Sequence, residues 1–215
     1  MVKTLKNKQH NPAHPCDRQA QLEQSFNEFW NKSLKTSGEK YYSKLTGDDF
    51  ISLKSAISCV NNIITMKTTI AFIDYMLNMG YINPNDASVI KTHVLETNAN
   101  ANGFDIEYQG DELKIVAEVK CNKPVNNHSF GPAQVDGILH DLDGLVKGKT
   151  KSQIKVKDCL KFMVLLRLKA VEESMQKVIV DFNTSSPVKA KEIDKVDGSL
   201  TKDCIYVVYI DPDII

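Results

Sequence analysis

Apolar residues recur every three or four positions up to about residue 103, which is the spacing of amphipathic helices. Residues 17–35 form the first such segment, with Asp17 as its candidate N-cap. Residues 47–80 continue the pattern and predict two helices, the second ending at Gly80. A further helix follows, with Asp86 as its candidate cap. The first half of the chain is therefore predicted to be mainly helical.

After residue 103 the pattern changes to short apolar runs. Residues 104–109 and 113–121 alternate as the strands of a hairpin around the turn-like QGDE, and 131–146 return to helical spacing. A nearly continuous apolar run at 159–168 is typical of a strand buried on both faces. Another strand is predicted at 203–210, whereas 170–182 fits either a helix or a strand. A strand–helix–strand step requires a crossover, so we expect an α/β (α+β) fold with a mixed sheet flanked by helices.

Length and composition fit a soluble globular protein. The chain has 215 residues, of which 42% are hydrophobic and 25% charged. We expect residues 1–16 to form a flexible arm and 17–215 to form a single domain. Within this domain, 17–100 is the mainly helical part and 101–215 is the α/β core.

Neither a membrane span nor a secretory signal is evident in the sequence. No continuous apolar run reaches about 18 residues, and the lysine-rich N-terminus lacks an apolar stretch. The five cysteines are odd in number, widely spaced and without a CxxC pair. This pattern favours free thiols over a disulfide framework or a zinc site. We therefore expect a cytoplasmic protein.

Charge is unevenly distributed, although the formal net charge of the chain is zero. Residues 84–118 carry a net charge of −5, and residues 144–169 carry +7. An acidic centre followed by a basic stretch fits a cation site beside a surface for a polyanion, although a solvated lysine-rich loop would give the same count. If nucleic acid binds, the expected phosphate contacts are Lys147, Lys149, Lys151, Lys155 and Lys157.

The hairpin brings charged residues onto one face. A two-residue turn at Gly110 and Asp111 would pair Glu107 with Lys114 and would make Asp105 a diagonal neighbour of Glu118, about 5–8 Å away between β-carbons. Phe104, Ile106 and Tyr108 would share the opposite face. Two carboxylates at that spacing can share one divalent cation.

Glu-x-Lys occurs twice in this hairpin, and only the second copy is predicted to be a site. Glu112–Lys114 lies at the turn, whereas Glu118–Lys120 lies in an apolar strand, where ionised groups are costly unless they are paired or bind metal. Hard oxygen ligands suit Mg²⁺, which activates a bound water and neutralises charge on a phosphate. Lys120 would orient that water or stabilise the transition state. The alternative is a buried ion-pair cluster of Asp105, Glu118 and Lys120.

GFDIEY and KIVAEVKCN resemble the signature of the PD-(D/E)xK nuclease superfamily, an Asp on one strand and Glu-x-Lys on its hairpin partner. The resemblance covers roughly a third of the chain, and Phe104 replaces the Pro of the motif. It implies a restriction endonuclease-like fold and Mg²⁺ held by Asp105, Glu118 and the carbonyl of Val119. By the same resemblance, Lys120 would assist an attacking water and the products would carry 5′-phosphates.

The resemblance also implies further residues and a substrate. Some members add an acidic residue from the preceding helix, for which Glu96 is the candidate, and some add a glutamine on the following helix, where Gln134 stands. A small stand-alone chain is most similar to a type II restriction endonuclease, a homodimer that cuts double-stranded DNA at a palindrome. A junction-resolving or repair nuclease and a non-catalytic DNA-binding module remain alternatives.

Two histidines receive no catalytic assignment. His140 and Asp141 resemble a metal-dependent phosphohydrolase pair, but the other ligands of such a site are not evident, so we interpret them as a helix-surface pair. His128 lies in a predicted loop and could contact DNA or simply face solvent.

Overall fold

The computed structural model divides the chain into two compact units, Met1–Ile57 and Ser58–Ile215. The sequence predicted one domain from residue 17 onward; the packing places a boundary within that range. Of the predicted arm, only the last two positions are described, and there the first helix begins. The described residues are 15–96, 103–111, 113–124, 128–152, 154–196 and 199–214.

The N-terminal unit is helical, as its periodicity predicted. Its centre is a cluster of aromatic rings, in which the ring centroid of Phe26 lies 6.0 Å from that of Tyr42 and 5.8 Å from that of Phe50. Apolar burial and ring–ring geometry stabilise this small unit. Its elements are α1 (Pro15–Leu34), the 3-10 helix η1 (Tyr42–Lys44) and the first part of α2 (Gly47–Asn78).

α2 is one continuous helix, so the prediction of two helices over 47–80 is wrong. No glycine or proline interrupts residues 48–78, and the backbone hydrogen bonds can therefore run unbroken. Thr46 and Asp49 cap its start reciprocally: the Asp49 carboxylate accepts from the Thr46 N–H at 2.8 Å, and the Thr46 hydroxyl accepts from the Asp49 N–H at 3.3 Å. Gly80, with φ 71°, follows the helix end, as predicted.

By length and composition alone, α2 could also cross a membrane, and it is the helix of the described chain that passes this test. The sequence itself predicted no such span, because it has no continuous apolar run of about 18 residues. Phe72, Ile73 and Met76, near the C-terminal end of α2, are buried in the core of the α/β unit. A helix that packs against a core meets the same criterion, so the absence of a membrane span stays a prediction.

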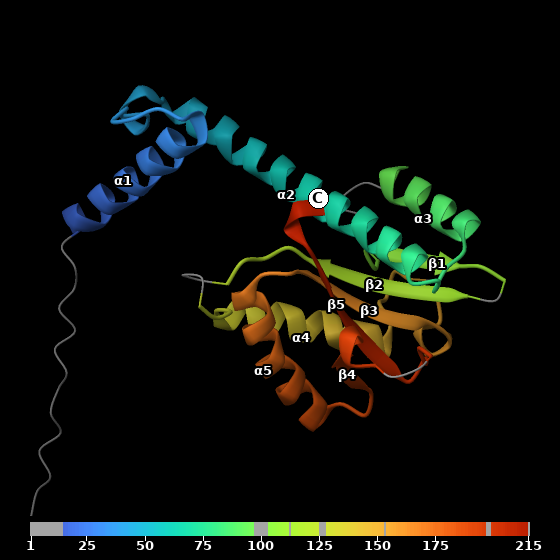
Figure 1. Ribbon diagram of the computed structural model, residues 1–215. Helices are drawn as coiled ribbons and strands as arrows, with labels where there is room; N and C mark the ends of the chain where they lie inside the picture. Colours follow the sequence, from blue (N-terminus) through green and yellow to red (C-terminus); the bar gives the residue numbers. More distant parts are fainter. Residues whose placement is uncertain are drawn as a thin grey trace, which may run out of the picture. The chain divides into compact units, whose positions relative to one another are not determined.

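The C-terminal unit is built on a five-stranded sheet of order β1-β2-β3-β5-β4 (Figure 1). β1 and β2 are antiparallel, and the other neighbours are parallel, which confirms the predicted mixed sheet. The strands of the sheet are β1 (Ile106–Gln109), β2 (Lys114–Lys120), β3 (Leu160–Leu166), β4 (Lys189–Glu192) and β5 (Cys204–Ile210). The edge strand β4 was not predicted.

Helices cover both faces of this sheet, as the two core clusters and Figure 1 show. The C-terminal part of α2 and α3 (Pro84–Glu96) pack on one face. α4 (Pro132–Lys147) and α5 (Lys169–Ser185) pack on the other, and α5 occupies the segment whose pattern was ambiguous. β3 lies between them and is buried along its whole length, as its continuous apolar run predicted.

The hairpin register differs from the predicted one by two residues. Residues 110–113 join the strands, with the Gly110 N–H donating to the Leu113 carbonyl at 2.9 Å. Gln109 therefore pairs with Lys114, and the predicted pairing of Glu107 with Lys114 is wrong. The longer connection is the reason, because it replaces the two-residue turn on which that register depended.

A shift of two residues keeps every strand residue on its predicted face, because side chains alternate with a period of two. The shift changes the partner of Asp105, which lies just before β1. If the register is continued one residue beyond Ile106, Asp105 stands directly opposite Glu118, where a diagonal position was predicted. Phe104 departs from the prediction: it packs with Val116 and the α4–α5 side of the sheet, not with Ile106. The chain is not yet in strand conformation at Phe104, so the alternation does not apply there.

The cap of α3 also differs from the prediction. Asn83 is the capping residue, because its side-chain oxygen accepts from the Asp86 N–H at 2.9 Å. Its side-chain amide donates to the Asp86 carboxylate at 2.9 Å, so Asp86 closes the cap from within the first turn.

The core predicts the cost of removing one central ring. Phe162 on β3 is 0% exposed, and its ring centroid lies 5.2 Å from that of Phe72 and 5.8 Å from that of Tyr206. Phe162→Ala should lower the free energy of unfolding by about 3–5 kcal/mol in a denaturant titration. The exposed Val180→Ala should change it by less than about 0.5 kcal/mol, and an equal loss in both variants would contradict this core assignment.

Candidate active site

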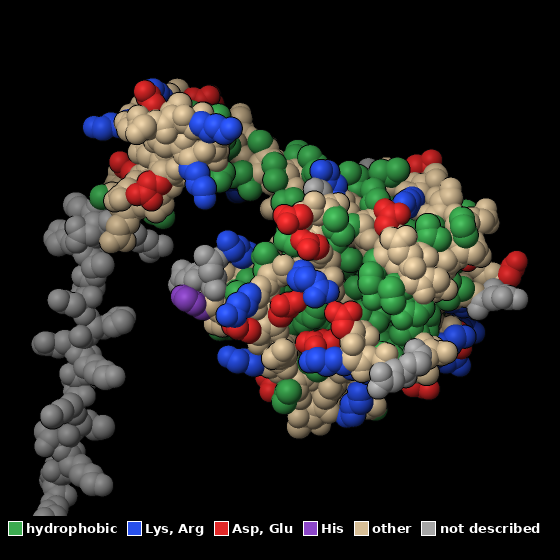
Figure 2. Space-filling model, viewed as in Figure 1, with side chains coloured by type: hydrophobic (Ala, Val, Ile, Leu, Met, Phe, Trp, Pro, Cys, Tyr) green, Lys and Arg blue, Asp and Glu red, His purple; other side chains and the backbone are tan. Residues whose placement is uncertain are grey.

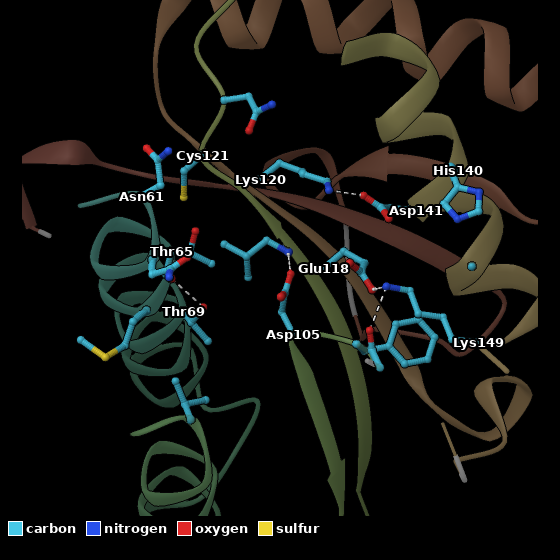
Figure 3. Close-up of a pocket in the computed structure, with 18 of the residues that line it drawn as sticks. Asn61, Thr65, Thr69, Asp105, Glu118, Lys120, Cys121, His140, Asp141 and Lys149 are labelled. Carbon is cyan, nitrogen blue, oxygen red and sulfur yellow. Dashed lines mark hydrogen bonds and ion pairs between the residues drawn. The ribbon is translucent and has the colours of Figure 1, made fainter. Parts of the chain in front are cut away.

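A cleft of ≈1340 Å³ opens at one end of the sheet in the C-terminal unit. Figure 3 shows that α2 forms one wall, with Asn61, Thr65 and Thr69, and that α4 and the loop after it form the other. The N-terminus of β1 and the C-terminal half of β2 lie between these walls. A groove between helices at the end of sheet strands is a common position for a ligand site in α/β folds.

Asp105 and Glu118 enter this cleft from adjacent chain segments. Glu118 belongs to β2 and is 3% exposed. Asp105 precedes β1, and its Oδ2 accepts a hydrogen bond of 2.7 Å from the backbone N–H of Val119. In an antiparallel pair, the N–H and carbonyl of one residue point to the same edge, so the Val119 carbonyl also lies on the Asp105 side. The predicted carboxylate pair is therefore brought together.

Two lysines form ion pairs in the cleft, one with a third carboxylate and one with Glu118. The Nζ of Lys120 lies 2.6 Å from Oδ2 of Asp141, which projects from α4. The Nζ of Lys149, just after α4, lies 2.5 Å from Oε1 of Glu118. Both contacts appear in Figure 3. When all groups are ionised, three carboxylates face two ammonium groups, and one negative charge is left for a further cation.

Burial shifts the proton affinities of this cluster. Desolvation raises the pKa of Glu118 to about 7, although Lys149 acts to lower it, and the charge of Asp105 adds to the rise. Asp105 is exposed as a residue, but the cleft walls desolvate its carboxyl group in part, which raises its pKa against the hydrogen bond from Val119. Burial alone would lower the pKa of Lys120, but its hydrogen bond to Asp141 and the carboxylate charges raise it above the usual value. Lys120 is therefore a cation at neutral pH.

Glu96 and Gln134, the two residues added by resemblance, are placed differently from each other. Glu96 is exposed at the end of α3 and lines a separate small pocket with Val89 and Thr92, so the structure does not bring it to the cleft. Gln134 lines the cleft, but its amide binds backbone groups: it accepts from the Gly131 N–H at 3.0 Å and donates to the Lys123 carbonyl at 2.9 Å. These contacts fix the start of α4.

The lysines predicted to contact phosphate separate into two groups. Lys147, Lys149 and Lys151 line the cleft, whereas Lys155 and Lys157 are exposed outside it. Figure 2 shows basic and acidic side chains interspersed on the visible face of this unit, with no broad basic surface. The candidate polyanion contacts are therefore those of the cleft wall.

Asp141 is a candidate site residue that the sequence did not predict, because its position beside His140 favoured a helix-surface pair. His140 does lie exposed on α4, but Asp141 is 6% exposed. The sequence carried a signal: Asp141 stands beside Leu142, between Ile138 and Leu145, on the apolar face of α4. A carboxylate on a buried helix face is costly unless it has a partner, here Lys120.

The donor set fits one hard cation with few protein ligands. The described residues contain no cluster of three or more His, Cys, Asp or Glu side chains arranged to hold a metal. Asp105, Glu118 and the Val119 carbonyl supply oxygen only, which suits Mg²⁺, an ion that keeps several waters. The buried Oε1 of Glu118 has no hydrogen-bond donor of good geometry among the described residues beyond its ion pair with Lys149.

Glu118 should titrate near neutral pH. Carbon-13 NMR of the carboxyl groups should show one glutamate with a midpoint at about pH 7, and this signal should vanish in Glu118→Gln. Because 7 is above the usual value of 4.5, the folded chain binds this proton more tightly than the unfolded chain does. The contribution of Glu118 to the free energy of unfolding should therefore fall as the pH rises from 4.5 to 7. A midpoint at 4.5 would refute this assignment.

The arrangement of the cleft is suited to stabilising charge on an anionic substrate. It offers a carboxylate pair with a spare negative charge, a protonated lysine beside that pair and further lysines on one wall. Groups of this kind can promote hydrolysis of a phosphate ester, because they stabilise the charge that develops on phosphate oxygens. No family model, curated protein or solved structure matches the chain.

Proposed function

We propose that the protein is a Mg²⁺-dependent endodeoxyribonuclease that hydrolyses phosphodiester bonds and leaves 5′-phosphates. The observation that carries this proposal is the convergence of Asp105, Glu118 and Lys120 at one end of the β1–β2 hairpin, inside a cleft. These are the residues in which the chain resembles the PD-(D/E)xK superfamily. The mixed sheet with helices on both faces supports a restriction endonuclease-like fold.

In the proposed mechanism, each residue acts through a stated atom. The carboxylates of Asp105 and Glu118 and the Val119 carbonyl would hold Mg²⁺, which when bound would supply an activated water and neutralise phosphate charge. Lys120 is protonated, so it donates a hydrogen bond to the attacking water or to a phosphate oxygen and does not act as a base. Asp141 positions Lys120 and maintains its charge.

The cleft walls support DNA as the substrate. Lys147 and Lys151 stand where backbone phosphates of a bound strand could pass, and the facing wall of α2 offers the uncharged polar side chains Asn61 and Thr65. Amide and hydroxyl groups can hydrogen-bond base edges, whereas ammonium groups bind phosphate. We propose a cytoplasmic homodimer that cuts double-stranded DNA at a palindrome, as a type II restriction endonuclease does. A junction-resolving or repair nuclease with the same residues is the alternative nuclease.

One observation favours a different class of function. Both lysines of the cluster are already paired with carboxylates, Lys120 with Asp141 and Lys149 with Glu118. In an ion-pair cluster of this kind, each of the two buried carboxylates already has a lysine partner without a metal. The chain would then be a non-catalytic DNA-binding module.

Cleavage assays with the two Glu-x-Lys lysines separate these functions. Purified protein should cut plasmid DNA in Mg²⁺ and not in EDTA. Lys120→Met should lower the rate by about 10²-fold or more, since a charge that stabilises the transition state is lost. Lys114→Met, in the other Glu-x-Lys copy at the turn end of β2, should cut at close to the wild-type rate.

The products decide between the nuclease classes. Discrete fragments would support a sequence-specific endonuclease, and cutting of branched DNA alone would support a junction-resolving enzyme. Absence of cleavage on linear, supercoiled and branched DNA would reject the nuclease and leave the ion-pair cluster as the role of Asp105, Glu118 and Lys120.

The lysine grouping predicts a salt dependence of DNA binding. In EDTA, where no cutting occurs, fluorescence anisotropy gives the slope of log K against log salt concentration. The double variant Lys147→Ala with Lys151→Ala should reduce the magnitude of this slope by about 2, because each lost phosphate contact contributes about 0.9 to it. Lys155→Ala with Lys157→Ala removes the same charge outside the cleft and should leave the slope nearly unchanged. Equal reductions would mean that phosphate contacts are not confined to the cleft wall, and an unchanged slope in the cleft variant would mean that this wall does not bind phosphate.

A further inference from the structure

Lys149 was predicted to contact phosphate, but its ammonium group lies among oxygen atoms of the carboxylate site. Its Nζ is 2.5 Å from Glu118 Oε1 and 2.9 Å from the backbone carbonyl of Gly103. It also lies 5.2 Å from the centre of the Phe104 ring, which adds a cation–π contact. Carboxylate and carbonyl oxygens are the ligands that a hard divalent cation would use.

The backbone around Lys149 is shaped for this placement. Gly148 turns the chain after α4 with φ 88°, a conformation that side-chain-bearing residues rarely adopt. The stem of Lys149 runs along α4 at Gly144, one turn earlier: a β-carbon at Gly144 would lie in van der Waals contact, 3.4 Å from Cε and 3.6 Å from Cγ of Lys149. The turn at Gly148 thus lets the side chain pass the end of α4 and reach Glu118.

We propose that Lys149 is an internal counter-cation that occupies the metal-binding carboxylate until a divalent ion displaces it. This inference rests on the proposed function, because it assigns Glu118 to that metal. The ammonium group and the metal compete for the same oxygen of a carboxylate whose side chain is 4% exposed, so both cannot be bound there at full strength. Lys149 therefore weakens metal binding in the free protein.

The same contact links metal binding to DNA binding. Lys149 lines the cleft between Lys147 and Lys151, where a phosphate would offer its ammonium group a new partner. A phosphate that draws Lys149 from Glu118 frees the carboxylate for the metal. By linkage, metal that displaces Lys149 favours phosphate binding to the same degree. The site is loaded together with its substrate, which limits metal binding without DNA.

The test is isothermal titration of Mg²⁺ into the full-length protein without DNA, at a pH of about 8.5, where protons compete little for Glu118. Lys149→Met keeps the length and apolar stem of the side chain and removes the charge. It should bind Mg²⁺ about tenfold more tightly than wild type, as expected when a competing charge leaves a largely buried carboxylate. The matched control is Lys147→Met, which removes a lysine paired with Asp143 on the same wall. It should change the affinity by less than about twofold.

A second readout needs no DNA either. Mg²⁺ should raise the melting temperature of Lys149→Met more than that of wild type, because ligand stabilisation grows with affinity. Folding of each variant is checked by its cooperative melt without metal.

The outcomes separate this inference from the proposed function. Equal or weaker Mg²⁺ affinity in Lys149→Met, with measurable binding to wild type, would overturn the role of Lys149 alone. Failure of both proteins to bind Mg²⁺ would overturn the inference and the nuclease proposal together. Tighter binding in Lys149→Met without any DNA cleavage by wild type would retain the counter-cation role and reject the nuclease.

Discussion

The burial of Glu118 is the constraint on which the site depends. β2 lies between two neighbouring strands, with helices on both faces of the sheet, so a carboxylate at this position has lost nearly all contact with water. A buried charge without compensation costs several kcal/mol, and the protein places the ammonium group of Lys149 against this one, with the charge of Lys120 nearby. The charged chemistry of the cleft follows from this one burial.

Rigid and adjustable parts of the site have different origins. Asp105 and Glu118 are fixed by the hairpin, because one accepts a backbone hydrogen bond and the other is held in a central strand. The two lysines reach the cluster on long side chains, and their partners come from α4 or from the hairpin. A ligand can therefore change the lysine contacts without altering the sheet. The carboxylates keep their positions meanwhile, and a reaction site requires groups that are held in place in this way.

The sequence predicted those features that depend on local periodicity. The hairpin, the buried strand β3 and the grouping of Asp105, Glu118 and Lys120 on one face follow from alternation, which tolerated the error of two residues in the register. Asp141 and Lys149 could not be placed in the same way, because their distance from the hairpin is set by how α4 packs on the sheet. Likewise, the edge strand β4 is short and half-exposed, so it left no apolar run to recognise.

The pairing of β1 with β2 also constrains how this chain can change over evolutionary time. A slip of one residue in that pairing would turn β1 over and direct Asp105 to the opposite face of the sheet. A slip of two residues would keep its face and move it only along the partner strand. Loops of different length can join the same paired strands, so the connection at residues 110–113 is free to lengthen or shorten as long as Ile106 stays opposite Ala117. In a relative of this chain, that pairing should therefore mark descent of the acidic pair more reliably than the length or sequence of the loop.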